Sequence, residues 1–103
     1  MTDEFLEIKD ENEQTIALNV SVFESIVADI IENDTYVELS EKKGLRCTIE
    51  DNALKIHANI RVKTGHNVIS TAEVLQEKIF ERIYQMTAIR CRSIDLNISG
   101  FIF

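Results

Sequence analysis

Apolar residues alternate with polar ones, without interruption, from position 54 to position 62. The apolar set is Leu54, Ile56, Ala58, Ile60 and Val62. A period of two is the signature of a β-strand that has one buried face and one exposed face. This stretch therefore predicts a strand whose even positions face the core and whose odd positions form a polar face.

Two segments have the spacing of amphipathic helices. Their apolar stripes are Phe23, Ile26, Val27, Ile30 and Ile31 in the first, and Val68, Ala72, Leu75, Ile79, Ile83 and Met86 in the second, which Phe80 and Tyr84 widen. Such stripes recur every three or four residues on a helix that packs on a core. Ser21 precedes Glu24, and Ser70 precedes Glu73, at the spacing of a capping box, which predicts that the helices start at these serines.

Shorter alternations predict further strands at 16–20, 37–39, 45–49 and 94–100. Ile89 and Cys91 are out of phase with Ile94, so we expect a bulge or bend near Ser93. The order of strand, helix, three strands, helix and strand predicts an α+β fold, with both helices on one face of a small single sheet. No repeat or linker interrupts residues 1–103, which we interpret as one domain with an acidic segment, 1–14, as a short strand or an arm.

The net charge of −7 is divided unevenly along the chain. Residues 1–41 hold twelve acids against one base, Lys9, whereas residues 42–103 hold ten bases against six acids. A strongly acidic chain repels phosphate backbones, which disfavours nucleic acid as a partner. The division allows two copies to attract each other through opposite ends, and a merely solvated acidic third is the alternative.

The odd positions of the central strand form the candidate interaction face. Its members are Arg46, Lys55, His57, Arg61 and Lys63, with Arg46 contributed by the neighbouring strand. This cationic stripe would dock an acidic partner, including the acidic third of another copy. The alternative is a solvated polar face, which is what a sheet covered on one side normally shows.

Metal binding and catalysis have little support in the sequence. His57 and His66 are close in sequence, but one lies on the polar face and the other in the turn at Gly65, so they do not converge as metal ligands must. Cys47 and Cys91 alternate with apolar neighbours, which indicates buried, reduced thiols. No phosphate loop, nucleophile elbow or pair of carboxylates in an apolar context is found, so we predict no cofactor and no enzyme.

The same residues give little support to two further classes, RNA-binding modules and membrane or secreted proteins. A K-homology or RRM-type RNA-binding module shares the element order, but the G-x-x-G loop and the stacking aromatics of these modules are missing. No apolar run approaches the ~20 residues that a membrane span needs, and the acidic start is unlike a signal peptide. We therefore expect a cytoplasmic protein.

A set of framework residues extends over nearly the whole chain, about residues 16–101. It comprises Lys43-Gly44, Gly65, Asn67-Val68, Ala72, Gln76, Met86-Thr87-Ala88-Ile89 and the final Ile94-x-Leu96-x-Ile98-x-Gly100. This pattern resembles the alkaline-shock-protein family of bacterial envelope stress response proteins. Tyr36, Ile69 and Ala88 depart from it, since glycine, proline and glycine respectively are usual there.

The resemblance implies a non-enzymatic cytoplasmic protein of mainly Gram-positive bacteria that responds to alkaline and envelope stress. Some members self-assemble and associate with the membrane through a separate anchoring protein. It implies no catalytic or metal-binding residues. We accordingly expect a scaffold or adaptor that acts through self-association and protein partners at the membrane, without direct membrane insertion, with a small RNA-binding or ribosome-associated module as the alternative.

Overall fold

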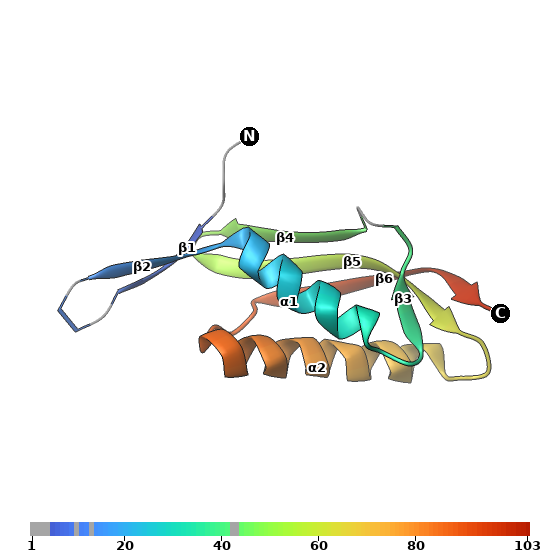
Figure 1. Ribbon diagram of the computed structural model, residues 1–103. Coiled ribbons are helices and arrows are strands. Elements are labelled where there is room, and N and C mark those ends of the chain that lie inside the picture. The colour runs from blue at the N-terminus through green and yellow to red at the C-terminus, as the bar shows by residue number, and fades with distance from the viewer. Residues whose placement is uncertain (1–4, 10, 13, 42–43) are drawn as a thin grey trace.

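The computed structural model describes residues 5–9, 11–12, 14–41 and 44–103. Within these ranges the elements are β1 (Phe5–Lys9), β2 (Thr15–Asn19), α1 (Val20–Glu32), β3 (Val37–Leu39), β4 (Leu45–Glu50), β5 (Ala53–Lys63), α2 (Val68–Thr87) and β6 (Ser93–Ile102). The predicted α+β class and element order are confirmed, with β1 preceding β2. Figure 1 shows the elements in an elongated molecule.

β5 is the central strand of the four-stranded sheet. β6 runs parallel to it from Lys55 to Lys63, and β3 and β4 pair with it antiparallel. Because β6 occupies one edge along this whole length, β3 and β4 lie end to end on the other. At their junction, Asn59 donates to the Gly44 carbonyl (2.8 Å) and accepts from the Ser40 amide (2.9 Å). The sheet is therefore mixed, with parallel and antiparallel pairs.

The hydrophobic core lies between the sheet and the two helices. The even-numbered residues of β5 are all buried, as the alternation predicts. α1 packs on β3 and β4, α2 lies beside β6, and the helices contact each other on this same face of the sheet (Figure 1). Burial of Phe23, Leu75 and Ile79 on this face, at about 1.5–3 kcal/mol per side chain, holds the layers together.

Both helices begin earlier than the capping-box spacing predicts. The N-cap residues are Asn19, whose Oδ1 accepts from the Ser21 amide at 2.9 Å, and Asn67, whose Oδ1 accepts from the Ser70 amide at 2.9 Å. Ser21 and Ser70 thus lie inside their helices, and the predicted capping boxes are wrong. Asparagine caps a helix as well as serine does, and here each asparagine directly precedes the valine that begins its helix.

The buried stripe of α2 is narrower than predicted. Leu75, Ile79 and Ile83 are fully buried, but Phe80, Tyr84 and Met86 are exposed. These three residues fit the helical spacing, but they lie at the edge of the apolar stripe. The sheet and α1 do not cover this part of the surface of α2. Their exposure leaves apolar surface on the outer side of α2.

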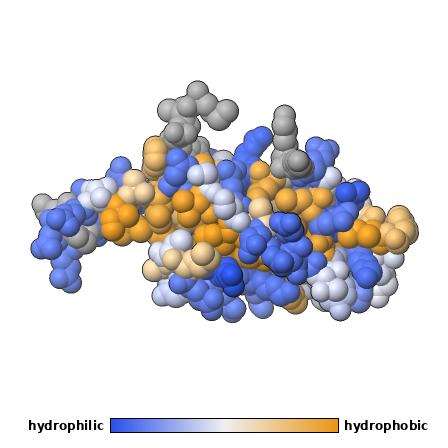
Figure 2. All heavy atoms as spheres, in the orientation of Figure 1, coloured by the Kyte–Doolittle hydropathy of each residue, from blue (hydrophilic) through white to orange (hydrophobic). Residues whose placement is uncertain are grey.

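β1 and β2 form a two-stranded sheet of their own, so the predicted single sheet holds only β3 to β6. The hairpin projects from one end of the molecule (Figure 1). It is attached at its base, where Leu6 is buried in the core. Ile16 is 57% exposed, and Figure 2 shows apolar side chains gathered where the hairpin meets the body.

The start and the end of β6 depart from a regular strand. The phase change expected near Ser93 is a bend at Arg92, before the strand begins. The bulge is elsewhere: Ile60 pairs with Ile98 and Arg61 pairs with Gly100, so the extra residue is Ser99. Consequently Gly100 does not continue the inward phase of Ile94 to Ile98, as its spacing predicts, but lies opposite Arg61.

Candidate interaction face

The sheet face opposite the helices, which we call the outer face, carries all five predicted interaction residues. Arg46 of β4 pairs directly with His57 of β5, and Lys55, Arg61 and Lys63 follow at alternate positions along β5. Arg46, His57, Arg61 and Lys63 are exposed, and Lys55 is half-buried. The structure therefore brings these residues together on one uncovered surface.

Carboxylates neutralise part of this surface. Lys55 Nζ lies 2.8 Å from a Glu50 carboxylate oxygen, and Arg61 lies 3.0 Å from Glu38. The ion pair with Lys55 lowers the pKa of Glu50, and the more distant Arg92 contributes to the same shift. Such exposed pairs add little to stability, but they reduce the charge available to a partner.

The remaining charges make the face mixed rather than uniformly basic. Asp95 of β6 lies beside His57 in the register. Among the residues that the structure describes, no ion pair is found for Arg46 or Lys63. These two cations, near opposite ends of the face, are the ones most available to an acidic partner.

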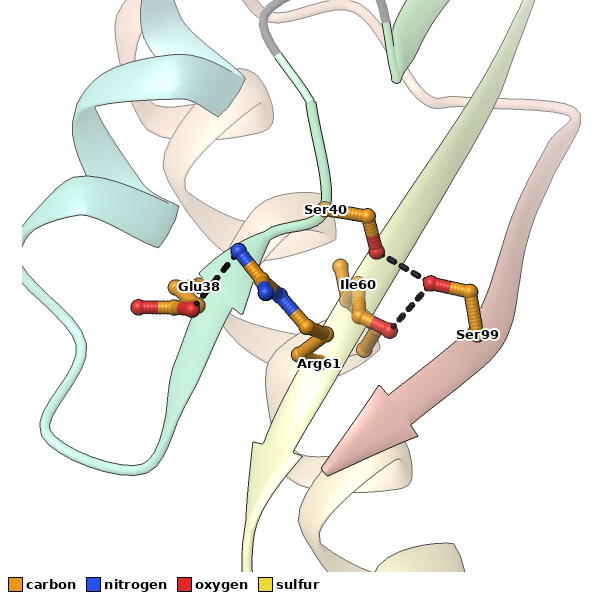
Figure 3. A network of polar contacts seen from close by, with 5 residues as sticks. All are labelled: Glu38, Ser40, Ile60, Arg61 and Ser99. Carbon is orange, nitrogen blue, oxygen red and sulfur yellow. Dashed lines mark hydrogen bonds and ion pairs between the residues drawn. The ribbon is translucent and has the colours of Figure 1, made fainter. Parts of the chain in front are cut away.

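A polar network fixes the middle of the face, as Figure 3 shows. The hydroxyls of Ser40 and Ser99 hydrogen-bond to each other, and Ser99 Oγ also donates to the Ile60 carbonyl at 3.3 Å. Ser40 follows β3 and Ser99 is the bulged residue of β6, so the network joins elements on both edges of β5. In the sequence Ser99 looks like an ordinary polar position of a strand, and no signal marks this contact.

The histidines and cysteines occupy separate parts of the structure. His57 lies on the outer face, whereas His66 contacts Tyr36, with the ring centroids 4.3 Å apart and the ring planes tilted by 53°. No group of three potential metal ligands occurs in the described ranges of the chain. Burial, followed by the negative charges of Glu24 and Cys91, raises the pKa of Cys47 to about 12, and burial raises that of Cys91 to about 11. Both thiols therefore stay protonated and unreactive near neutral pH.

Comparison with known protein families identifies the family of this chain. Residues 19–103 match the family model of the alkaline shock protein 23 family, which is described as having a cell envelope-related function. The chain belongs to this family. The match begins at the last residue of β2, so nearly the whole hairpin precedes it. Searches of curated proteins and of solved structures gave no match.

The family assignment confirms the resemblance and gives the chain a cell envelope-related function. It does not favour the RNA-binding alternative. In the part of the chain that the structure describes, no helix is both long enough and apolar enough to cross a membrane.

Proposed function

We propose that this protein is a non-enzymatic scaffold or adaptor that serves the cell envelope from the cytoplasmic side, through contacts with further copies of itself and with protein partners. The observation that carries the proposal is the projecting hairpin. A two-stranded hairpin is marginally stable in water, and this one extends past its buried anchor, Leu6, with apolar surface still exposed.

The hairpin and the outer face are complementary in charge. Sequence positions 5–19 contain four acids and only Lys9 as a base. On the outer face, Arg46 and Lys63 have no ion-pair partner in the described residues. The hairpin of one copy would therefore be attracted to the outer face of the next, in a head-to-tail contact that can repeat along a row of copies.

A charge exchange tests this contact. One variant, Arg46→Glu/Lys63→Glu, has an acidic hairpin and an acidic face. The other, Glu7→Lys/Glu11→Lys, leaves positions 5–19 with two acids and three bases, so its hairpin carries a net positive charge like its face. We expect each variant alone to be monomeric by light scattering, and a mixture of the two to assemble. Arg82→Glu/Arg90→Glu, on the helix side, is the control with the same change of charge, and it should assemble as the unmodified chain does.

Restored assembly in the mixture requires opposite charges at these two surfaces, since general repulsion would keep the variants apart regardless of position. Assembly of either variant alone, to the same mass as the unmodified chain, would contradict the proposal. So would a mixture that stays monomeric although the unmodified chain assembles.

A further inference from the structure

A groove lies between α2 and the residues that lead into β6. Its helix side is formed by Glu73, Glu77, Phe80 and Glu81, and its strand side by residues 91–94. Gln76 spans the two sides, because its Nε2 donates to the main-chain carbonyl of Ile94 at 2.9 Å. The width of the groove is thus set by a direct hydrogen bond between helix and strand.

The helix side of the groove is acidic. Glu73, Glu77 and Glu81 recur every fourth residue, which places them in one row along α2. All three are exposed, and none forms an ion pair with a basic residue that the structure describes. Like charges at this spacing destabilise a helix. Arg92, on the strand side, is the one cation among the described residues that line the groove, so the groove keeps a net negative charge.

Apolar surface adjoins this acidic row. Phe80 is 38% exposed and lies between Glu77 and Glu81 in the lining of the groove. Tyr84, one turn further along α2, is 44% exposed and has the Arg90 guanidinium 5.3 Å from its ring centroid. The aliphatic stem of a lysine or arginine side chain that reaches these glutamates would cover this apolar surface.

The strand side of the groove is the beginning of an edge strand. β6 pairs with β5 on one side, and no strand described in the structure pairs with it on the other. Edge strands are templates for further pairing unless lysine, proline, a bulge or a covering element blocks them. β6 contains neither lysine nor proline; its protections are the bulge at Ser99 and the bond from Gln76.

We propose that this groove binds an extended segment of a partner protein that has lysine or arginine at every second position. Four residues of an α-helix advance about 6 Å, and two residues of an extended chain advance about 6.7 Å. Alternate basic side chains of such a segment would therefore lie opposite Glu73, Glu77 and Glu81 in turn. The side chains between them point to the other face of the segment.

The occupant is a basic partner and not a second copy. If two copies paired along their β6 edges, their rows of glutamates would face each other and repel. The hairpin of a second copy, which is itself acidic, is excluded on the same ground. This inference rests on the proposed adaptor role but not on self-association, since a monomeric chain presents the same groove.

Fluorescence anisotropy with a labelled peptide of about 12 residues, alternating lysine and valine, tests the proposal at ~50 mM salt. The control peptide has the same composition, with all lysines before all valines. We expect the alternating peptide to bind, and Glu73→Gln/Glu77→Gln/Glu81→Gln to weaken it about tenfold, the sum of three exposed ion pairs. Glu11→Gln/Glu32→Gln/Glu41→Gln removes as many charges elsewhere and should weaken it by less than about twofold.

Equal affinity for both peptides, or equal weakening by both triple variants, would overturn the proposal, because each shows attraction to net charge alone. Amide chemical shifts locate the contact. Changes should concentrate on α2 and on Ser93–Ile102; changes confined to the outer face around Arg46 and Lys63 would also overturn it.

Discussion

The side-chain amide of Asn52 forms two hydrogen bonds with the main chain of Glu7. Its Oδ1 accepts from the Glu7 amide at 2.9 Å, and its Nδ2 donates to the Glu7 carbonyl at 3.1 Å. Asn52 thus supplies β1 with the pair of bonds that a neighbouring strand would give. Asp51 and Asn52 both have positive φ, 51° and 55°, as the tight turn between β4 and β5 requires. One residue therefore both shapes this turn and holds the hairpin.

Asn52→Gly separates these two roles, because glycine keeps the positive φ but has no side chain. We expect the amides of β1 and β2 to exchange with solvent about thirtyfold faster, since two hydrogen bonds of about 1 kcal/mol each are lost. Hydrogen exchange followed by mass spectrometry measures this, with the amides of β5 as the internal control. Unchanged exchange in the hairpin would show that Asn52 does not hold it.

Leu6 and Ile16 lie on the same side of the hairpin but differ in burial, at 3% and 57% exposure. Leu6→Ala should lower the free energy of unfolding by about 2 kcal/mol, because it leaves a cavity where the hairpin meets the core. Ile16→Ala should change it by less than about 0.5 kcal/mol, as an exposed site. Denaturant unfolding of both variants checks the difference. Equal losses would mean that the hairpin is not anchored through Leu6.

Ala88, which follows α2, has φ 61° and ψ 12°, and its amide donates to the Tyr84 carbonyl at 2.8 Å. This left-handed conformation strains a residue with a Cβ but not glycine. We predict that Ala88→Gly raises the free energy of unfolding by about 1 kcal/mol. Ala28→Gly, within α1, is the matched control and should lower it by about 1 kcal/mol. Destabilisation by both would contradict the prediction.

The central sheet and both helices could be predicted because their apolar periods are long. Alternation from Leu54 to Val62 predicts which face of β5 is buried, and it places His57 and Arg61 on the other. The alternation of Ile94 to Ile98 likewise predicts β6. These patterns depend on local geometry alone, so no knowledge of the remaining chain is needed.

The structural features that the sequence does not predict depend on contacts between residues far apart in the chain. Whether Phe80 and Tyr84 are buried depends on how far α1 and the sheet extend over α2. The helical spacing of apolar residues gives no information about this. The ion pairs that neutralise Lys55 and Arg61 require the strand register. Asn52 gives a turn signal in the sequence, but its bonds to Glu7 join residues 45 positions apart.

The buried thiols predict how stability changes at alkaline pH. Free thiols of the unfolded chain ionise near pH 9.0, whereas burial raises the pKa of Cys47 to about 12 and that of Cys91 to about 11. Between about pH 9 and pH 11 the unfolded chain releases protons that the folded chain retains, so the free energy of unfolding falls as pH rises.

Cys47→Ala removes one of these groups. We expect a smaller fall in the free energy of unfolding between about pH 8 and pH 10.5 in this variant, measured by denaturant titration at each pH. Its stability at pH 8 is the reference, because the cavity costs the same at both pH values. A fall as steep as that of the unmodified chain would show that Cys47 ionises equally in both states.

The molar mass of the unmodified chain, measured by light scattering across a concentration series at low and high salt, tests the central claim most directly. If copies associate through the acidic hairpin and the outer face, the mass rises above 11.8 kDa with concentration at low salt. It should fall back at high salt, because exposed charges are then screened over a few ångströms. A constant 11.8 kDa at every concentration and salt would contradict self-association.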